Sequence, residues 1–121
     1  MRDCADAFSA TYAEARAKFL AAAKARGCAI ESRVHPSAKG AEGEPLAMDV
    51  ATGGRTDSEG LLLVTSATHG VEGFCGSGCQ VAWLEDEPAM SLARRQGVAV
   101  LLIHAVNPYG FSHLCRVNED N

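Results

Sequence analysis

Residues 61–73, LLLVTSATHGVEG, are the stretch from which the rest of the chain is interpreted. The apolar run at residues 61–64 predicts a buried strand, and small polar residues end it. His69 and Glu72 follow, three residues apart, where the strand gives way to a helix-like segment. In open α/β sheets, ligands bind at this carboxyl end of a strand.

His69 and Glu72 carry the donor atoms of a zinc site. Imidazole nitrogen and carboxylate oxygen are both zinc ligands. Gly70 and Gly73 give the backbone the freedom to turn both side chains toward one point. An isolated H-x-x-E is equally compatible with a helix start that carries a solvated glutamate and a hydrogen-bonded histidine. These four residues therefore leave a metal site and a structural helix start open.

The composition is that of an ordinary globular domain. The 121 residues are 47% hydrophobic and 21% charged, which allows one small domain with a core of its own. The net charge of -4, with no basic run, argues against a nucleic-acid partner. No apolar segment has the length of a membrane span, and the first residues lack the layout of a signal peptide. We therefore expect a cytoplasmic location and no membrane partner.

Five cysteines are scattered along the chain: Cys4, Cys28, Cys75, Cys79 and Cys115. An odd count, irregular spacing and no export signal indicate reduced thiols rather than a disulfide framework. Cys75 and Cys79 are one helical turn apart, a spacing at which two thiols can share a metal. Small, buried packing residues are the more common use of such a pair, and we adopt that interpretation.

The first sixty residues predict a packing helix and two strands. The helix is expected over residues 3–26, where apolar side chains recur at three and four residues. Strands at residues 28–34 and 46–50 form a hairpin-like pair, separated by an exposed loop at residues 37–45. His35, followed by proline, ends the first strand and is interpreted as a surface turn residue.

The second half predicts a strand–helix–strand unit that starts from residues 61–66. Residues 74–84 are expected to be helical, and residues 89–96 form a further short helix. The run VAVLLIHA at residues 98–105 is interpreted as a central strand covered on both faces. His104, inside that strand, is interpreted as a hydrogen-bonded core residue.

A right-handed crossover makes the strands at residues 61–66 and 98–105 parallel neighbours or near neighbours in one sheet. Their ends then fall at the same edge of the sheet. His69 and Glu72 are accordingly expected beside the segment NPYGF, residues 107–111.

The order of these motifs resembles that of the zinc carboxypeptidases and their succinylglutamate desuccinylase and aspartoacylase relatives. An apolar strand, H-x-x-E, a helix, a second apolar strand, Asn-Pro-x-Gly-Phe and an arginine follow one another in both. The segments THGVEGFCGSG and NPYGFSHLCRVNEDN look most like a bacterial branch known only as a domain of unknown function. The resemblance covers residues 61–121. It implies a three-layer α/β fold with a mixed, mostly parallel sheet and flanking helices. Residues 1–121 would then be a single domain, the N-terminal portion of a catalytic domain.

The same resemblance implies roles for individual residues. His69 and Glu72 match the first two zinc ligands, and Arg116 matches the arginine that polarises the substrate carbonyl and steadies the oxyanion. Asn107 and Tyr109 lie in the turn that shapes the substrate-binding wall of the pocket. The implied activity is zinc-dependent amide hydrolysis, of the metallocarboxypeptidase or N-acyl amino acid deacylase type. A small peptide or an N-acyl amino acid would be the substrate.

Several parts of the family's site have no counterpart in this sequence. An Asp-x-Asn-Arg-like segment, a second histidine ligand and a glutamate general base come later in the family, and His104 and His113 lie in the wrong place to replace that ligand. Catalytic zinc normally has three protein ligands and a water. We therefore expect the chain alone to be inactive, as the N-terminal part of such an enzyme.

Two alternatives stay open. A cysteine nucleophile, Cys75 with His69, would make the protein an enzyme of another class; the sequence has no G-x-S-x-G, P-loop or G-x-G-x-x-G motif. A non-enzymatic fragment or degenerate copy would instead act through protein–protein association at an unfinished sheet edge. Formation of a homo-oligomer would be the sign of that second alternative.

Overall fold

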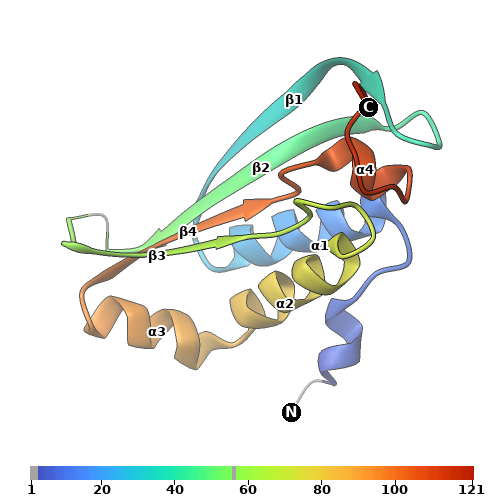
Figure 1. The fold of residues 1–121 in the computed structure, drawn as a ribbon. Helices are drawn as coiled ribbons and strands as arrows, with labels where there is room; N and C mark the ends of the chain where they lie inside the picture. The colour runs from blue at the N-terminus through green and yellow to red at the C-terminus, as the bar shows by residue number, and fades with distance from the viewer. Residues whose placement is uncertain (1–2, 56) are drawn as a thin grey trace.

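The computed structural model describes residues 3–55 and 57–121, which form an α/β fold with a four-stranded mixed sheet and flanking helices (Figure 1). The strands are β1 (Ala29–Lys39), β2 (Pro45–Gly54), β3 (Gly60–Thr65) and β4 (Val98–His104). The helices are the 3-10 turn η1 (Cys4–Ala7), α1 (Tyr12–Ala25), α2 (Gly73–Glu85), α3 (Glu87–Arg95) and the short α4 (Pro108–Ser112).

The sheet has the strand order β1-β2-β4-β3. Strands β3 and β4 pair in parallel, with Leu63 opposite Leu101, which confirms the predicted strand–helix–strand unit. The hairpin of β1 and β2 is also confirmed, and β2 pairs antiparallel with β4. The expectation of a mostly parallel sheet is wrong for these strands, because only one of their three pairings is parallel.

Helices α1, α2 and α3 lie on one side of the sheet (Figure 1). Along β4, Val100, Leu102 and His104 are buried, whereas the residues between them are only partly covered. The prediction that this strand is covered on both faces is therefore wrong within the described chain. The prediction that residues 61–64 form a buried strand is also wrong there, because every residue of β3 is exposed at the edge of the sheet. Residues 3–55 and 57–121 build a sheet and one helical layer, and the third layer has no counterpart among them.

The N-terminal elements differ from their predicted bounds. The expected single helix is divided into η1 and α1, because Thr11 adopts an extended backbone and caps α1 through a bond from the Glu14 N–H to its hydroxyl. Strand β1 continues through His35 to Lys39, with a break in register after Val34. Proline is tolerated there because β1 is an edge strand. The expected loop is accordingly shortened to residues 40–44.

The core has two parts. The larger lies between the sheet and helices α1, α2 and α3 and includes Phe19, Leu84, Met90 and Leu102. The smaller lies under the ends of the strands, and consists of Tyr12, Ala15, Leu46, Ala67, Ala105 and Phe111. This second cluster joins α4 to α1 and so fixes the segment that follows β4. Among the described residues, no helix is long and apolar enough to cross a membrane.

His104 is a core residue, as predicted. Its ring is fully buried, stacks on Phe19 at a centroid distance of 4.7 Å, and its Nε2 lies 2.9 Å from the Ser77 hydroxyl. Nearby, the fully buried Asp49 carboxylate is bound by Arg16 at 2.7 and 3.1 Å. The imidazole and the ion pair place polar groups inside the interface between sheet and helices.

Candidate functional site

The segments that leave β3 and β4 stay paired beyond the strands. The Val106 N–H donates to the Ser66 carbonyl at 3.0 Å, and the Asn107 N–H donates to the Ala67 carbonyl at 2.8 Å. These bonds extend the parallel ladder, so the two chain segments emerge side by side at one edge of the sheet. This is the edge at which the sequence placed the candidate ligands.

Gly70 connects the segment after β3 to the segment that follows α4. Its N–H donates to the Cys115 carbonyl at 3.1 Å, and the Cys115 N–H donates to the Gly110 carbonyl at 3.0 Å. A Cβ at Gly70 would lie 1.9 Å from the Gly110 oxygen and 2.1 Å from the Cys115 oxygen. No larger residue fits there without moving backbone, so glycine is required for this contact rather than for a special φ angle.

Asn107 holds the turn that follows β4. Its Oδ1 accepts from the Gly110 N–H at 2.9 Å, and its Nδ2 donates to the Val117 carbonyl at 3.1 Å. Its side chain therefore caps α4 and anchors the segment that carries Arg116. Tyr109 stacks on His113 at a centroid distance of 4.1 Å and is not among the residues that line the cavity described next.

His69 and Arg116 are brought together by these contacts. The guanidinium Nη2 of Arg116 lies 3.5 Å from Nε2 of His69, and the Arg116 carbonyl lies 3.4 Å from Nδ1. A carbonyl only accepts and a guanidinium only donates, so the contacts favour the tautomer with the proton on Nδ1. Both side chains line a cavity of about 440 Å³, so Arg116 faces the same cleft as His69.

His35 lines the same cavity, a placement that sequence reasoning missed. Its Nδ1 accepts from the backbone N–H of Ser37 at 3.3 Å and of Ala38 at 2.9 Å, so the ring proton is on Nε2. That nitrogen lies 2.6 Å from the Glu119 carboxylate. A backbone N–H and the His35 bond lower the pKa of Glu119. The only sequence signal was the histidine itself, and its significance depends on β1 continuing past residue 34.

Glu72 lies at the start of α2 and is exposed. Its side chain does not cap the helix, and it is not one of the residues that line the cavity beside His69. The convergence of Glu72 with His69 on one point stays a prediction. Because the Glu72 carboxylate forms no capping bond, its oxygens are not used by the helix start and can serve as metal ligands.

Cys75 and Cys79 are both exposed, so their interpretation as buried packing residues is wrong. Helix α2 turns Ser77, Val81 and Leu84 toward the core. The two cysteines lie on the opposite side of the helix, because they are about half a turn from those positions.

A sequence profile of one protein family matches residues 8–121, nearly the whole chain. The chain belongs to the DUF2817 family. That family is described as a protein of unknown function. No curated protein sequence matches the chain.

Two solved structures resemble the fold of this DUF2817 chain, and both are of glutaminyl cyclase from Porphyromonas gingivalis. The first is 17% identical, with a TM-score of 0.41, and the match covers 87% of this chain and 48% of that one. The second is 18% identical, with a TM-score of 0.40, and the match covers 76% and 38%. The DUF2817 chain thus spans half or less of the length of these proteins, and likenesses this weak do not say what it does.

The donor atoms of this DUF2817 chain fit a zinc site only in part. His69 offers an unprotonated Nε2 in the cavity, and Glu72 offers a carboxylate three residues later. Within residues 3–55 and 57–121, no group of three or more His, Cys, Asp or Glu side chains is placed to hold a metal ion. A complete catalytic zinc site needs three protein ligands, so these residues do not form one.

Proposed function

We propose that this DUF2817 chain carries part of the active site of a zinc-dependent amide hydrolase. One observation carries the proposal: the His69 imidazole and the Arg116 guanidinium lie side by side in one cavity, at the edge where β3 and β4 end. The order of motifs shared with zinc carboxypeptidases and deacylases supports the same conclusion. Small peptides and N-acyl amino acids are the proposed substrates.

Each residue has a separate role in the proposal. His69 and Glu72 are the two metal ligands, and the Arg116 carbonyl orients the His69 ring by accepting the bond from its Nδ1. The Arg116 guanidinium stabilises negative charge on a substrate carbonyl oxygen, an effect worth roughly 3–4 kcal/mol at one such donor. When bound, zinc supplies a water whose pKa is lowered to about 7.

The chain alone lacks groups that amide hydrolysis requires. Among the described residues, no third side chain is placed to complete a metal site with His69 and Glu72. The sequence also has no residue that matches the general base of the resembled enzymes. We therefore expect no amide hydrolysis by the 121-residue chain, with or without zinc. Zinc-dependent turnover that is lost in His69→Ala would show that the missing groups are present after all.

Zinc binding tests the ligand assignment directly. We expect the chain to bind one zinc ion weakly in competition with a chromophoric chelator, and His69→Ala and Glu72→Ala to lose that binding. His113→Ala is the matched control, because His113 bonds the Lys39 carbonyl outside the cavity. Unchanged zinc affinity in His69→Ala would refute the proposal.

A second candidate function, association with another copy of the chain, rests on strand β3. This strand is at the edge of the sheet, and Leu61 and Leu63 are 62% and 51% exposed. Residues 60–65 contain no charge and no proline, the usual devices that prevent edge pairing. Antiparallel pairing of two copies about residues 62–63 places Glu59 opposite Ser66, so no like charges meet.

The oligomeric state separates this function from the first. Sedimentation of the chain should show a dimer that Leu63→Lys converts to a monomer. Leu92→Lys, at an equally exposed leucine on α3, should leave the dimer intact. A monomeric wild-type chain at high concentration would exclude association through β3.

A further inference from the structure

Helix α2 presents two thiols on one exposed face. Cys75 and Cys79 are four residues apart, so they lie one above the other on the helix surface. Both are exposed, and the opposite face of α2 is fixed by its buried residues Ser77, Val81 and Leu84. The orientation of the pair is therefore set by the packing of the whole helix.

The two thiols are neighbours on the surface of α2, because a spacing of four residues brings them to one side of the helix. Loss of hydration on the helix surface, and then the proximity of Cys75, raise the pKa of the Cys79 thiol above its ordinary value.

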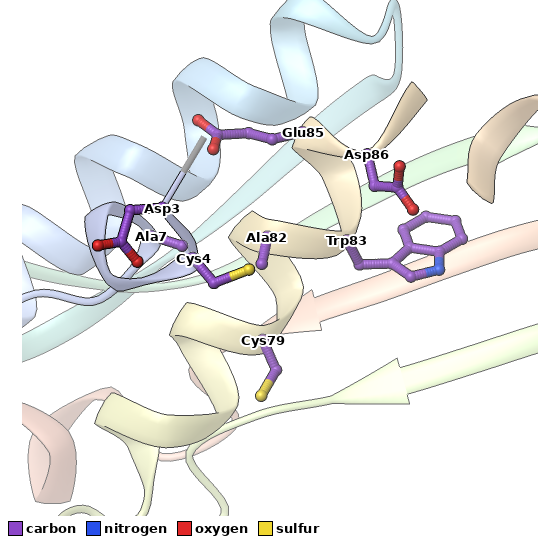
Figure 2. Close-up of a pocket in the computed structure, with 8 residues that line it drawn as sticks. All are labelled: Asp3, Cys4, Ala7, Cys79, Ala82, Trp83, Glu85 and Asp86. Atoms are coloured by element: carbon purple, nitrogen blue, oxygen red, sulfur yellow. The ribbon is translucent and has the colours of Figure 1, made fainter. Parts of the chain in front are cut away.

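The surroundings of the pair limit how many donors an ion can gain. Cys79 also borders a cavity of about 590 Å³, which Cys4 and Trp83 line as well (Figure 2). In Figure 2 the Cys4 sulfur is directed toward α2 near Ala82, whereas the Cys79 sulfur points away from the helix. No group of three ligating side chains occurs among residues 3–55 and 57–121, so the site has two donors.

We propose that Cys75 and Cys79 form a binding site for one soft metal ion that accepts two-coordinate thiolate ligation, with Cu(I) as the ion of this class. Thiolates favour Cu(I), zinc and iron–sulfur clusters. Structural zinc takes four ligands, so of these ions Cu(I) is the one that two sulfur donors can satisfy. On binding, both S–H bonds break, two S–Cu bonds form, two protons pass to the solvent, and the oxidation state of copper does not change. The site is separate from the cavity of His69.

Competition with a chromophoric Cu(I) chelator, under reducing and anaerobic conditions, tests the site. Wild-type chain should bind one Cu(I). The triple variant Cys4→Ser/Cys28→Ser/Cys115→Ser should keep that affinity, because it retains the pair. Cys75→Ser/Cys79→Ser should weaken binding at least 100-fold. A Cu(I) affinity of Cys75→Ser/Cys79→Ser equal to that of the wild-type chain would overturn the proposal, and so would loss of Cu(I) binding in the triple variant.

A variant with displaced spacing keeps the number of thiols constant. In Cys79→Ser/Ala82→Cys, the two thiols lie seven residues apart, a helical rise of about 10.5 Å. A shared ion spans only roughly twice a metal–sulfur bond of about 2.3 Å. Binding should therefore fall as far as in the double serine variant. Retained affinity would show that any two thiols suffice and that this pair is not a site.

The same titrations separate this site from the zinc proposal. His69→Ala should leave Cu(I) binding unchanged, and Cys75→Ser/Cys79→Ser should leave zinc binding unchanged. Both substitutions of cysteine are at exposed positions, and circular dichroism verifies that α2 is retained. Loss of Cu(I) binding in His69→Ala would move the copper site to the cavity and refute the assignment to α2.

Discussion

Nε2 of His35 lies 2.6 Å from Oε1 of Glu119, although the two residues are 84 positions apart in the chain. The contact ties the segment after Arg116 to the edge strand β1. Because Arg116 is three residues before Glu119, this bond also limits where the guanidinium beside His69 can lie. The His35 and Glu119 side chains are 18% and 30% exposed, so the bond is partly protected from solvent.

Removal of this contact should loosen the end of the chain. His35→Asn can keep an acceptor for the backbone N–H groups of Ser37 and Ala38 while losing the donor to Glu119. We expect faster amide exchange at residues 117–120 in His35→Asn and in Glu119→Ala, and little change in Glu119→Gln. The coupling in a double-mutant cycle should be small, because surface ion pairs are screened by solvent. Independent, additive effects would show that the two side chains do not interact.

His104 should make stability depend on pH. Burial lowers its pKa from 6.5 to about 4. Between these values the unfolded chain binds more protons than the folded one, so stability is complete above pH 6.5 and falls as the pH drops toward 4. The loss is about 3 kcal/mol for a shift of this size. Urea unfolding between pH 7.5 and 4 measures this loss. The dependence of the free energy of unfolding on pH should become weaker in His104→Gln and should stay unchanged in His113→Gln.

The sequence predicted the elements whose signals are local. The apolar runs of β3 and β4 and the intervening helix α2 were located within a few residues, because each contains its own hydrophobic pattern. The length of β1 was not predictable in the same way. Its pairing with β2 continues past a proline that would end an isolated strand.

The candidate site was predictable in part for the same physical reason. Parallel strands end at one edge, which places His69 near Arg116 whatever the side-chain detail. The spacing of Cys75 and Cys79 showed that they share a face of the helix but not which face is buried. That depends on packing between distant elements, such as Phe8, which occupies the space beside Gly78.

Removal of one partner of the Arg16–Asp49 ion pair should destabilise the protein more than replacement of both partners. Asp49 is fully buried and is bound by the Arg16 guanidinium and by the Ser32 hydroxyl. Arg16→Met leaves the carboxylate buried without a cation, and should lower the free energy of unfolding by about 3–5 kcal/mol. Arg16→Met/Asp49→Asn should recover most of that loss in urea unfolding. A single variant as stable as the wild type would mean that Asp49 is solvated.

Gly70→Ala should disrupt the junction that holds the site. The new Cβ would overlap two carbonyl oxygens, so the backbone that carries His69 must move. We expect a loss of more than about 2 kcal/mol in stability and weaker zinc binding. Gly60→Ala is the control, since a Cβ there makes only an ordinary contact of 3.6 Å with Val98. Equal stability of the two variants would contradict the close packing at Gly70.

Arg116→Ala separates the proposed oxyanion role from metal ligation. The Arg116 guanidinium points at Nε2 of His69, the atom that offers its lone pair to a metal. Removal of this positive charge should therefore leave zinc affinity equal or raise it by up to about tenfold, or 1.4 kcal/mol. His69→Ala, in contrast, should abolish zinc binding in the same chelator competition.

In a longer protein that supplies the missing ligand and base, Arg116→Ala should lower kcat by at least 100-fold, as loss of an oxyanion donor does, with the zinc content unchanged. Loss of zinc in Arg116→Ala would instead make this arginine a structural support of His69, and an unchanged kcat would remove it from the mechanism.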